Sequence, residues 1–122
     1  MSKDELNKGL QLAERLFGSI VEEVPLPDDF REFTLAHIFG GIWQGEGLSV
    51  EERSLVTCTV LIALNREAEQ RLHFVGAKNL GIPRARVEAA ISHVAVYAGW
   101  PVAVSAFRIL NEVWLSTEES LA

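Results

Sequence analysis

The sequence contains a single cysteine, Cys58, among its 122 residues. One cysteine cannot form an intrachain disulfide, a CxxC redox pair or a cysteine-based zinc site, and this usage is typical of a reducing compartment. Basic residues are also few. The chain has 11 Lys and Arg and 17 Asp and Glu, which gives a formal net charge of −6. Nucleic-acid affinity depends largely on cations that neutralise phosphates. We therefore expect neither nucleic acid nor an anionic membrane as a partner.

Long apolar runs are also missing, since no segment approaches the roughly 20 residues that a membrane-spanning helix requires. The first residues, Met1 to Glu5, are too acidic for the start of a signal peptide. Hydrophobic residues make up 48% of the chain and charged residues 23%, which is typical of a globular protein and excludes a disordered one. A chain of this length suits one domain over residues 1–122. These features together predict a cytoplasmic enzyme or binding module.

Strand-like alternation of polar and apolar residues is absent, and helical patterns predict an all-α fold of about six helices. Ser2 and Glu5 form a capping box before a helix that should run to about Val21. After two prolines, Asp28 or Asp29 opens a second helix. Its apolar side is expected to consist of Phe30, Phe33, Ile38 and Trp43.

Four further helices are marked by local start and stop signals. Ser49 and Glu52 form a second capping box before the third helix. This helix is apolar on nearly all sides, so we expect it to be central and its cysteine to be an inert packing residue. Proline and glycine turn residues then predict a fourth, a fifth and a sixth helix, over about residues 66–78, 83–99 and 101–113.

Two of the three histidines lie in the fourth and fifth predicted helices, each four residues from a second polar side chain. Glu69 precedes His73 and Tyr97 follows His93 at this spacing, which places each pair on one helix face. His73 is the candidate general acid/base, and Glu69 would orient it and select its tautomer. Arg66, three residues before Glu69, would bind a substrate carboxylate or hold Glu69. The competing interpretation is a solvated or intersubunit salt-bridge face.

The other candidate residues have a structural as well as a functional interpretation. His93 lies in a mostly apolar helix, where a hydrogen-bonded core histidine with Tyr97 as partner is the usual arrangement, and substrate binding by both is the alternative. Trp43 and Trp100 are expected to pack or to line a pocket. We expect His37 to be structural or exposed.

A metal site is a third interpretation, since Glu69, His73 and His93 offer three ligands. However, the E-x-x-x-H spacing of the first two differs from the E-x-x-H spacing of di-iron helix bundles. We therefore predict no metal.

Four motifs are spread along the chain: Phe39-Gly-Gly-Ile-Trp43, Leu72-His73, Gly76-Ala77-x-Asn79-x-Gly81 and, above all, Tyr97-Ala-Gly-Trp-Pro101. In combination they resemble the carboxymuconolactone decarboxylase family over almost the whole chain. The resemblance implies a small helical subunit of the AhpD-like fold that assembles into trimers or hexamers. It also implies decarboxylation of 4-carboxymuconolactone to the enol-lactone of 3-oxoadipate, in aromatic-compound catabolism and without a cofactor. On this basis the catalytic residues are His73 and Glu69, and the substrate-binding residues are Arg66, Trp43, His93 and Tyr97.

The family's other branch comprises peroxidase-like proteins with a CxxC pair, in which three residues separate the second cysteine from a histidine. Here the two cysteine positions before His73 hold Arg66 and Glu69, so dithiol chemistry is excluded. The chain also departs from the decarboxylase branch, because Gly45 and Glu46 replace Arg-Pro in the pattern Trp-x-Arg-Pro-Gly-Leu. An arginine can hold a substrate carboxylate and a glutamate would repel it, so the exact substrate is open. The alternative function is a non-catalytic oligomeric scaffold or ligand-binding relative.

Overall fold

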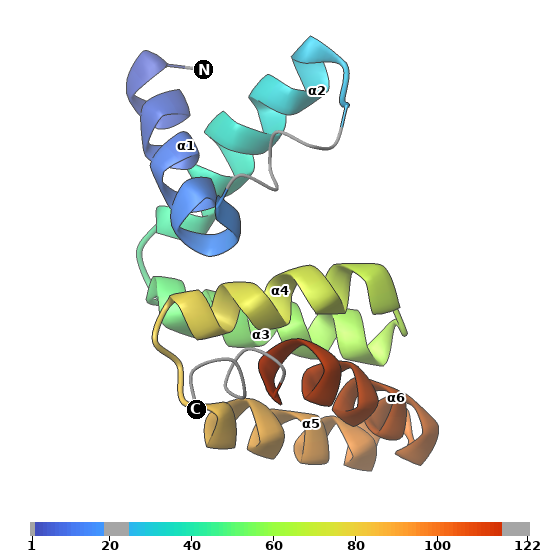
Figure 1. The fold of residues 1–122 in the computed structure, drawn as a ribbon. Coiled ribbons are helices and arrows are strands. Elements are labelled where there is room, and N and C mark those ends of the chain that lie inside the picture. The colour runs from blue at the N-terminus through green and yellow to red at the C-terminus, as the bar shows by residue number, and fades with distance from the viewer. Residues whose placement is uncertain (1, 19–24, 116–122) are drawn as a thin grey trace. The chain divides into compact units, whose positions relative to one another are not determined.

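The structure, a computed structural model, describes residues 2–18 and 25–115. Every regular element in these ranges is helical and none is a strand, so the all-α prediction is confirmed (Figure 1). No helix in the same ranges is long and apolar enough to cross a membrane. The α-helices are α1 (Lys3–Phe17), α2 (Asp28–Phe33), α3 (Val50–Ala63), α4 (Glu67–Asn79), α5 (Arg84–Ala98) and α6 (Trp100–Leu110). The other elements are the π-helix η2 (Thr34–Phe39), the 3₁₀-helix η3 (Ile42–Gln44) and the π-helix η4 (Asn111–Leu115).

Most helix boundaries follow the local signals of the sequence. Ser2 caps α1, because its hydroxyl accepts the backbone N–H of Glu5 at 3.1 Å. The predicted end of this helix near Val21 lies outside the described residues. Ser49 and Glu52 make both hydrogen bonds of a capping box before α3, at 2.8 and 3.1 Å. The ends of α4 and α5 each lie within one residue of the prediction.

Residues 1–53 and 54–122 form two compact units, and the boundary between them falls inside α3. A single domain over residues 1–122 stays a prediction. The units differ in charge, since residues 1–53 carry five Lys and Arg against eleven Asp and Glu, whereas residues 54–122 carry six of each. The whole net charge of −6 therefore belongs to the first unit.

The first unit is organised by a close backbone contact between α1 and η2. A Cβ atom on Gly9 would lie 1.6 Å from the carbonyl oxygen of Leu35, and a Cβ atom on Gly40 would lie 2.0 Å from that of Glu5. Only glycine leaves room for this approach. The buried apolar residues among those described in this unit are Leu12, Ala13, Leu16, Phe17, Leu35, Ala36 and Trp43.

The segment predicted as the second helix is divided into α2, η2 and η3, which changes the side chains that are buried. The backbone N–H of Gly40 donates to the carbonyl oxygen of Leu35, five residues back, at 2.9 Å. This is the hydrogen bond of a π-helix, whose wider turn shifts the helix face. Leu35, in η2, is buried, whereas Phe30 and Phe33, in the preceding α2, are exposed. The prediction that both phenylalanines face the core is wrong.

The turn over residues 45–48 is held by Arg53, which lies in the first turns of α3. Its guanidinium donates to the carbonyl oxygens of Gly45, Glu46 and Leu48 at 3.4, 3.1 and 3.3 Å. Glu46 itself is exposed. The turn that departs from the family pattern therefore takes its shape from a cation supplied eight residues after Gly45.

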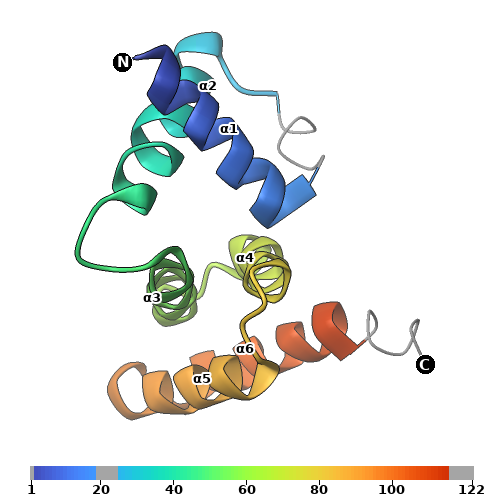
Figure 2. The same cartoon turned by 90° about the vertical axis from the view of Figure 1, so that its left-hand side faces the viewer.

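In the second unit, α4 runs antiparallel to α3, and α6 contacts both α4 and α5 (Figure 1, Figure 2). The side-chain amide of Gln70 on α4 donates to the carbonyl oxygen of Leu61 on α3 at 3.2 Å. The thiol of Cys58 on α3 donates to the carbonyl oxygen of His73 on α4 at 3.7 Å. The core includes Cys58, Ile62, Phe74, Ala77, Val87, Ile91, Ala103, Ala106, Ile109 and Leu110.

Helix α3 is less buried than its composition suggests. Ser54, Cys58 and Ile62 form its buried row. Val56 and Val60 lie outside this row and are about half exposed. The prediction of a central helix is therefore wrong, because only one side of α3 has helices of its own unit to pack against.

Gly9→Ala is expected to destabilise the first unit, because the new methyl group would overlap the carbonyl oxygen of Leu35. Overpacking of this kind costs about 1–3 kcal/mol, and sometimes more. Urea unfolding followed by circular dichroism measures the loss. Gly45→Ala is the matched control, since a Cβ atom there meets its nearest atom at 3.5 Å, an ordinary contact distance. Equal stability of the two variants would contradict the close contact.

Candidate active site

The candidate site lies along one edge of α4, beside the row of side chains that this helix buries. Gln70, Phe74 and Ala77 recur at helical spacing and are fully buried. Glu69 and His73 stand one turn apart next to this row and are partly exposed. The buried row fixes the orientation of α4, so the edge that carries Glu69 and His73 is held at the boundary with solvent.

Arg66 and Glu69 form the contact that their spacing predicts. Nε and Nη2 of Arg66 both approach Oε1 of Glu69, at 2.9 and 2.8 Å. The Arg66 side chain is 63% exposed and the Glu69 side chain 39%, so the ion pair contributes little to stability. Its effect is to hold the Glu69 carboxylate in place, one turn before His73.

Burial lowers the pKa of His73 from 6.5 to about 4, and the Glu69 carboxylate partly opposes this shift. The imidazole loses hydration on burial, which disfavours its charged form. Its Nδ1 atom has almost no contact with solvent. At neutral pH His73 is therefore a neutral imidazole, in which one ring nitrogen donates a hydrogen bond and the other accepts one.

Cys58 supports the backbone of α4 at His73 but has no reactive thiolate. Burial raises the pKa of the Cys58 thiol to about 12. The thiol is therefore protonated at neutral pH. It supports the site through its hydrogen bond to the carbonyl oxygen of His73. The prediction of a buried, inert cysteine is confirmed.

The second predicted pair, His93 and Tyr97, lies on α5 with ring centroids 5.3 Å apart. Both side chains are exposed, so the interpretation of His93 as a core histidine is wrong. The buried row of α5 passes through Val94 and leaves its neighbour His93 outside. The pair lines a shallow groove of about 440 Å³ between α5 and α3.

Trp43, Trp100 and the third histidine, His37, occupy packing or surface positions. In the first unit, Trp43 is buried and packs on Phe39 with ring centroids 5.5 Å apart. His37 is exposed, as predicted, and stacks on Phe33 at 5.1 Å. Trp100 is exposed at the start of α6. Among the described residues, no group of three or more His, Cys, Asp or Glu side chains could hold a metal ion.

Gln70 supports the site although no sequence motif indicates it. Its side chain is fully buried and donates to the carbonyl oxygen of Leu61, which also accepts the backbone N–H of Arg66 at 2.9 Å. Both hydrogen bonds tie the start of α4 to the end of α3. The available sequence signal was a polar residue at a buried helical position, three residues before His73.

A helical unit with a neutral histidine beside an ion-paired carboxylate defines a candidate proton-transfer site. The family model described as the carboxymuconolactone decarboxylase family matches residues 28–112, a range that includes Arg66, Glu69 and His73. The chain belongs to the carboxymuconolactone decarboxylase family.

Two curated proteins are similar to the chain. The 4-carboxymuconolactone decarboxylase of Acinetobacter baylyi is 37% identical over 86 residues, which cover 70% of this chain and 64% of that protein. The chain thus matches slightly less than two thirds of the bacterial protein. Nitrosuccinic acid decarboxylase npaB of Metarhizium robertsii is 29% identical over 122 residues, covering 91% of this chain and 85% of that protein.

Acidification is expected to lower the free energy of unfolding through His73. The pKa of His73 is about 4 in the folded chain, and 6.5, the ordinary value for histidine, applies to the unfolded chain. Between these two pH values the unfolded chain therefore binds a proton that the folded chain does not. The loss begins as the pH falls below 6.5, is complete below about 4, and amounts to about 3 kcal/mol at most. Urea unfolding at neutral and acidic pH measures it.

The control for this measurement is His73→Gln, which removes the titrating group but keeps a polar side chain. The variant should lose less stability than the parent protein over the same pH interval, because carboxylates titrate in both. The same loss in the two proteins would show that the pKa of His73 is not lowered.

Proposed function

We propose that this protein is a cofactor-independent decarboxylase of small carboxylic acids, with the unsaturated lactone 4-carboxymuconolactone as its first candidate substrate. The observation that carries the proposal is His73, held neutral on α4 beside the ion-paired Glu69. The names of both similar proteins support the reaction class. Membership of the carboxymuconolactone decarboxylase family supports the same reaction class.

Loss of carbon dioxide breaks one carbon–carbon bond and leaves its electron pair on the substrate. In an unsaturated lactone this pair spreads into the ring and onto the carbonyl oxygen, and a proton then adds to carbon. The enzyme therefore needs a hydrogen-bond donor at the oxygen and a proton source at the carbon. The substrate accepts its own electrons, so the reaction needs no cofactor.

His73 suits both tasks once an anionic substrate is bound. Its neutral imidazole donates one hydrogen bond. A substrate carboxylate nearby raises the pKa of His73, in the same direction as Glu69 already does. The imidazolium that this favours then gives its proton to carbon, and Glu69 orients the ring and stabilises its charged form.

Arg66 has a positioning role in this proposal, because it holds the Glu69 carboxylate. Its remaining N–H groups can also donate to a substrate carboxylate. The sequence resemblance adds two further parts to the proposal. One is substrate contact by Trp43, His93 and Tyr97, and the other is assembly into a trimer or hexamer.

A second candidate substrate has support from the fungal relative, whose name is nitrosuccinic acid decarboxylase. A nitro group, like a conjugated lactone carbonyl, accepts the electron pair that decarboxylation leaves behind. Nitrosuccinate should therefore be assayed beside 4-carboxymuconolactone.

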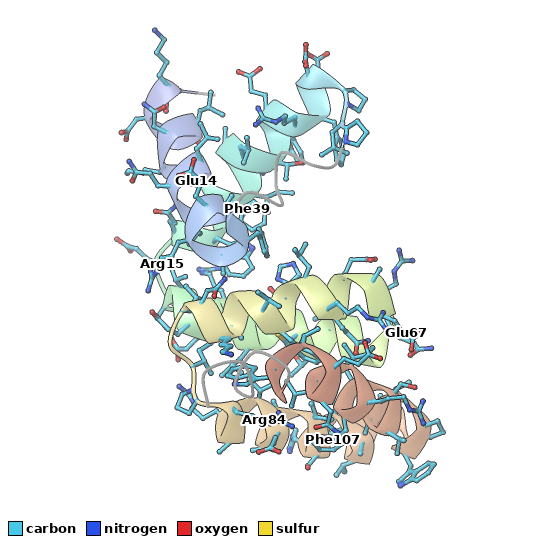
Figure 3. All side chains as sticks on the ribbon, viewed as in Figure 1. Glu14, Arg15, Phe39, Glu67, Arg84 and Phe107 are labelled. Carbon is cyan, nitrogen blue, oxygen red and sulfur yellow. The ribbon has the colours of Figure 1, made fainter. Side chains whose placement is uncertain are left out.

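The purified protein is expected to release carbon dioxide from one of these two acids. His73→Asn should lower kcat by about 10²–10⁴-fold, because asparagine can donate a hydrogen bond but cannot deliver a proton. Glu67→Gln is the control, since Glu67 is exposed at the start of the same helix (Figure 3). No carbon dioxide from either acid would support the non-catalytic ligand-binding alternative. Full activity of His73→Asn would refute its assigned role.

Arg66→Ala is expected to have a smaller effect, about tenfold or less, because the Arg66–Glu69 pair is largely exposed. If Arg66 only holds Glu69, the variant lowers kcat. If it also binds the substrate carboxylate, the variant raises KM as well. Steady-state kinetics of Arg66→Ala and Glu69→Gln separate these roles, and unchanged values of both constants in both variants would contradict the proposal.

A further inference from the structure

The first unit contains a small pocket between α1, η3 and the start of α3. Its volume is about 210 Å³. Every residue that lines it belongs to residues 1–53, so the pocket lies within one unit. Pockets for small molecules usually have volumes of about 300–1,000 Å³, so this one suits a ligand of a few carbons. The side chains that line it are Lys8, Gln11, Leu12, Arg15, Gln44 and Val50.

Two of the side chains in the pocket are cations. Lys8 and Arg15 stand seven residues apart on α1, which places them on one face of the helix. Gln11 lies between them on the same face, and Arg15 projects from α1 (Figure 3). The described residues that line the pocket include no Asp or Glu. The first unit has five Lys and Arg against eleven Asp and Glu, so the pocket collects two of its few cations.

Both cations keep N–H groups for a ligand. Nζ of Lys8 lies 3.4 Å from the carboxylate of Asp4, and Nη2 of Arg15 lies 3.7 Å from that of Glu51. These are exposed contacts, and ion pairs of this kind are weak. A lysine and an arginine each have several N–H donors, so one acid does not use them all. Neither Asp4 nor Glu51 lines the pocket, so an anion inside it meets the cations first.

The wall of the pocket is held in place by Gln44. Its side-chain amide nitrogen donates to the carbonyl oxygens of Lys8 and Phe39, at 3.0 and 2.8 Å. These two hydrogen bonds tie η3 to α1. Leu12 is buried and adds an apolar surface. The pocket is therefore formed before a ligand arrives, which reduces the entropic cost of binding.

We propose that this pocket binds a small dicarboxylate, with one carboxylate on Arg15 and the other on Lys8. The planar guanidinium fits a carboxylate, and the ammonium supplies a second positive charge. The two residues are about 10 Å apart along the helix axis, so two separated anionic groups fit them better than one compact anion. The amide of Gln11 donates to the ligand between them.

None of the pocket residues belongs to the candidate active site on α4. Binding at the pocket therefore does not depend on the proposed reaction and would hold for an inactive protein.

Isothermal titration calorimetry of the full chain with adipate tests the pocket. Adipate is a saturated dicarboxylate with no group that accepts the electrons of decarboxylation, so it stays intact. Acetate and inorganic phosphate, at the same ionic strength, represent a single carboxylate and a compact anion. The parent protein is expected to bind adipate saturably and about tenfold or more tightly than either, because only adipate reaches both cations.

Lys8→Gln, Arg15→Gln and Gln11→Glu are each expected to weaken adipate binding by about tenfold or more, because each removes or opposes a charged contact. All three side chains are exposed, so the fold should be kept, and circular dichroism checks this. Lys3→Gln is the matched control. It makes the same change in net charge at an exposed position of α1 outside the pocket, and it should keep the parent affinity.

Arg66→Ala separates this pocket from the candidate active site, where a carboxylate could also bind. This variant should bind adipate as the parent protein does. Loss of adipate binding in Arg66→Ala, with Arg15→Gln unaffected, would overturn the proposal. Equal losses in Lys3→Gln and Arg15→Gln would overturn it too, because they indicate a general electrostatic attraction. No binding of adipate by the parent protein, or equal affinity for phosphate, would do the same.

Discussion

The antiparallel contact between α3 and α4 is the interaction on which the candidate site depends. The carbonyl oxygen of Leu61 accepts one hydrogen bond from the side chain of Gln70 and another from the backbone of Arg66. One turn further along, the thiol of Cys58 meets the carbonyl oxygen of His73. These contacts hold His73 against the interior, where loss of hydration lowers its pKa to about 4. Helix packing thus determines the charge of the residue that is proposed to move the proton.

Two opposing effects meet at His73. Burial favours the neutral imidazole, Glu69 favours the charged one, and burial prevails in the free protein. A further negative charge is then needed before the histidine takes up a proton at neutral pH, and the carboxylate of a substrate can supply it. By the sequence resemblance, Arg66 and Glu69 correspond to the two positions expected to hold cysteines in the peroxidase-like branch. The same stretch of helix can therefore support proton transfer in place of thiol exchange.

Features that depend on neighbours along the chain could be predicted from the sequence. The capping boxes and the contact between Arg66 and Glu69 join residues three apart, and the structure contains them. Features that depend on which helices pack together could not. The π-helical hydrogen bond of η2 rotates a helix face, the exposure of His93 reflects the face that α5 buries, and Gln70 needs a partner on α3. The sequence also does not distinguish the apolar residues of α3 and α5 that are buried, such as Ile62 and Ile91, from those that are exposed, such as Val60 and Val96.

The central claim is that burial keeps His73 neutral until a carboxylate binds beside it. The most direct test is an NMR titration of labelled histidine, with the resonances of His73 assigned by comparison with His73→Asn. The titration is made with the free protein and with a saturated lactone carboxylate that cannot lose carbon dioxide. The account predicts a pKa of about 4 for His73 in the free protein and a higher value with the ligand. A pKa near 6.5 that does not change on binding would contradict it.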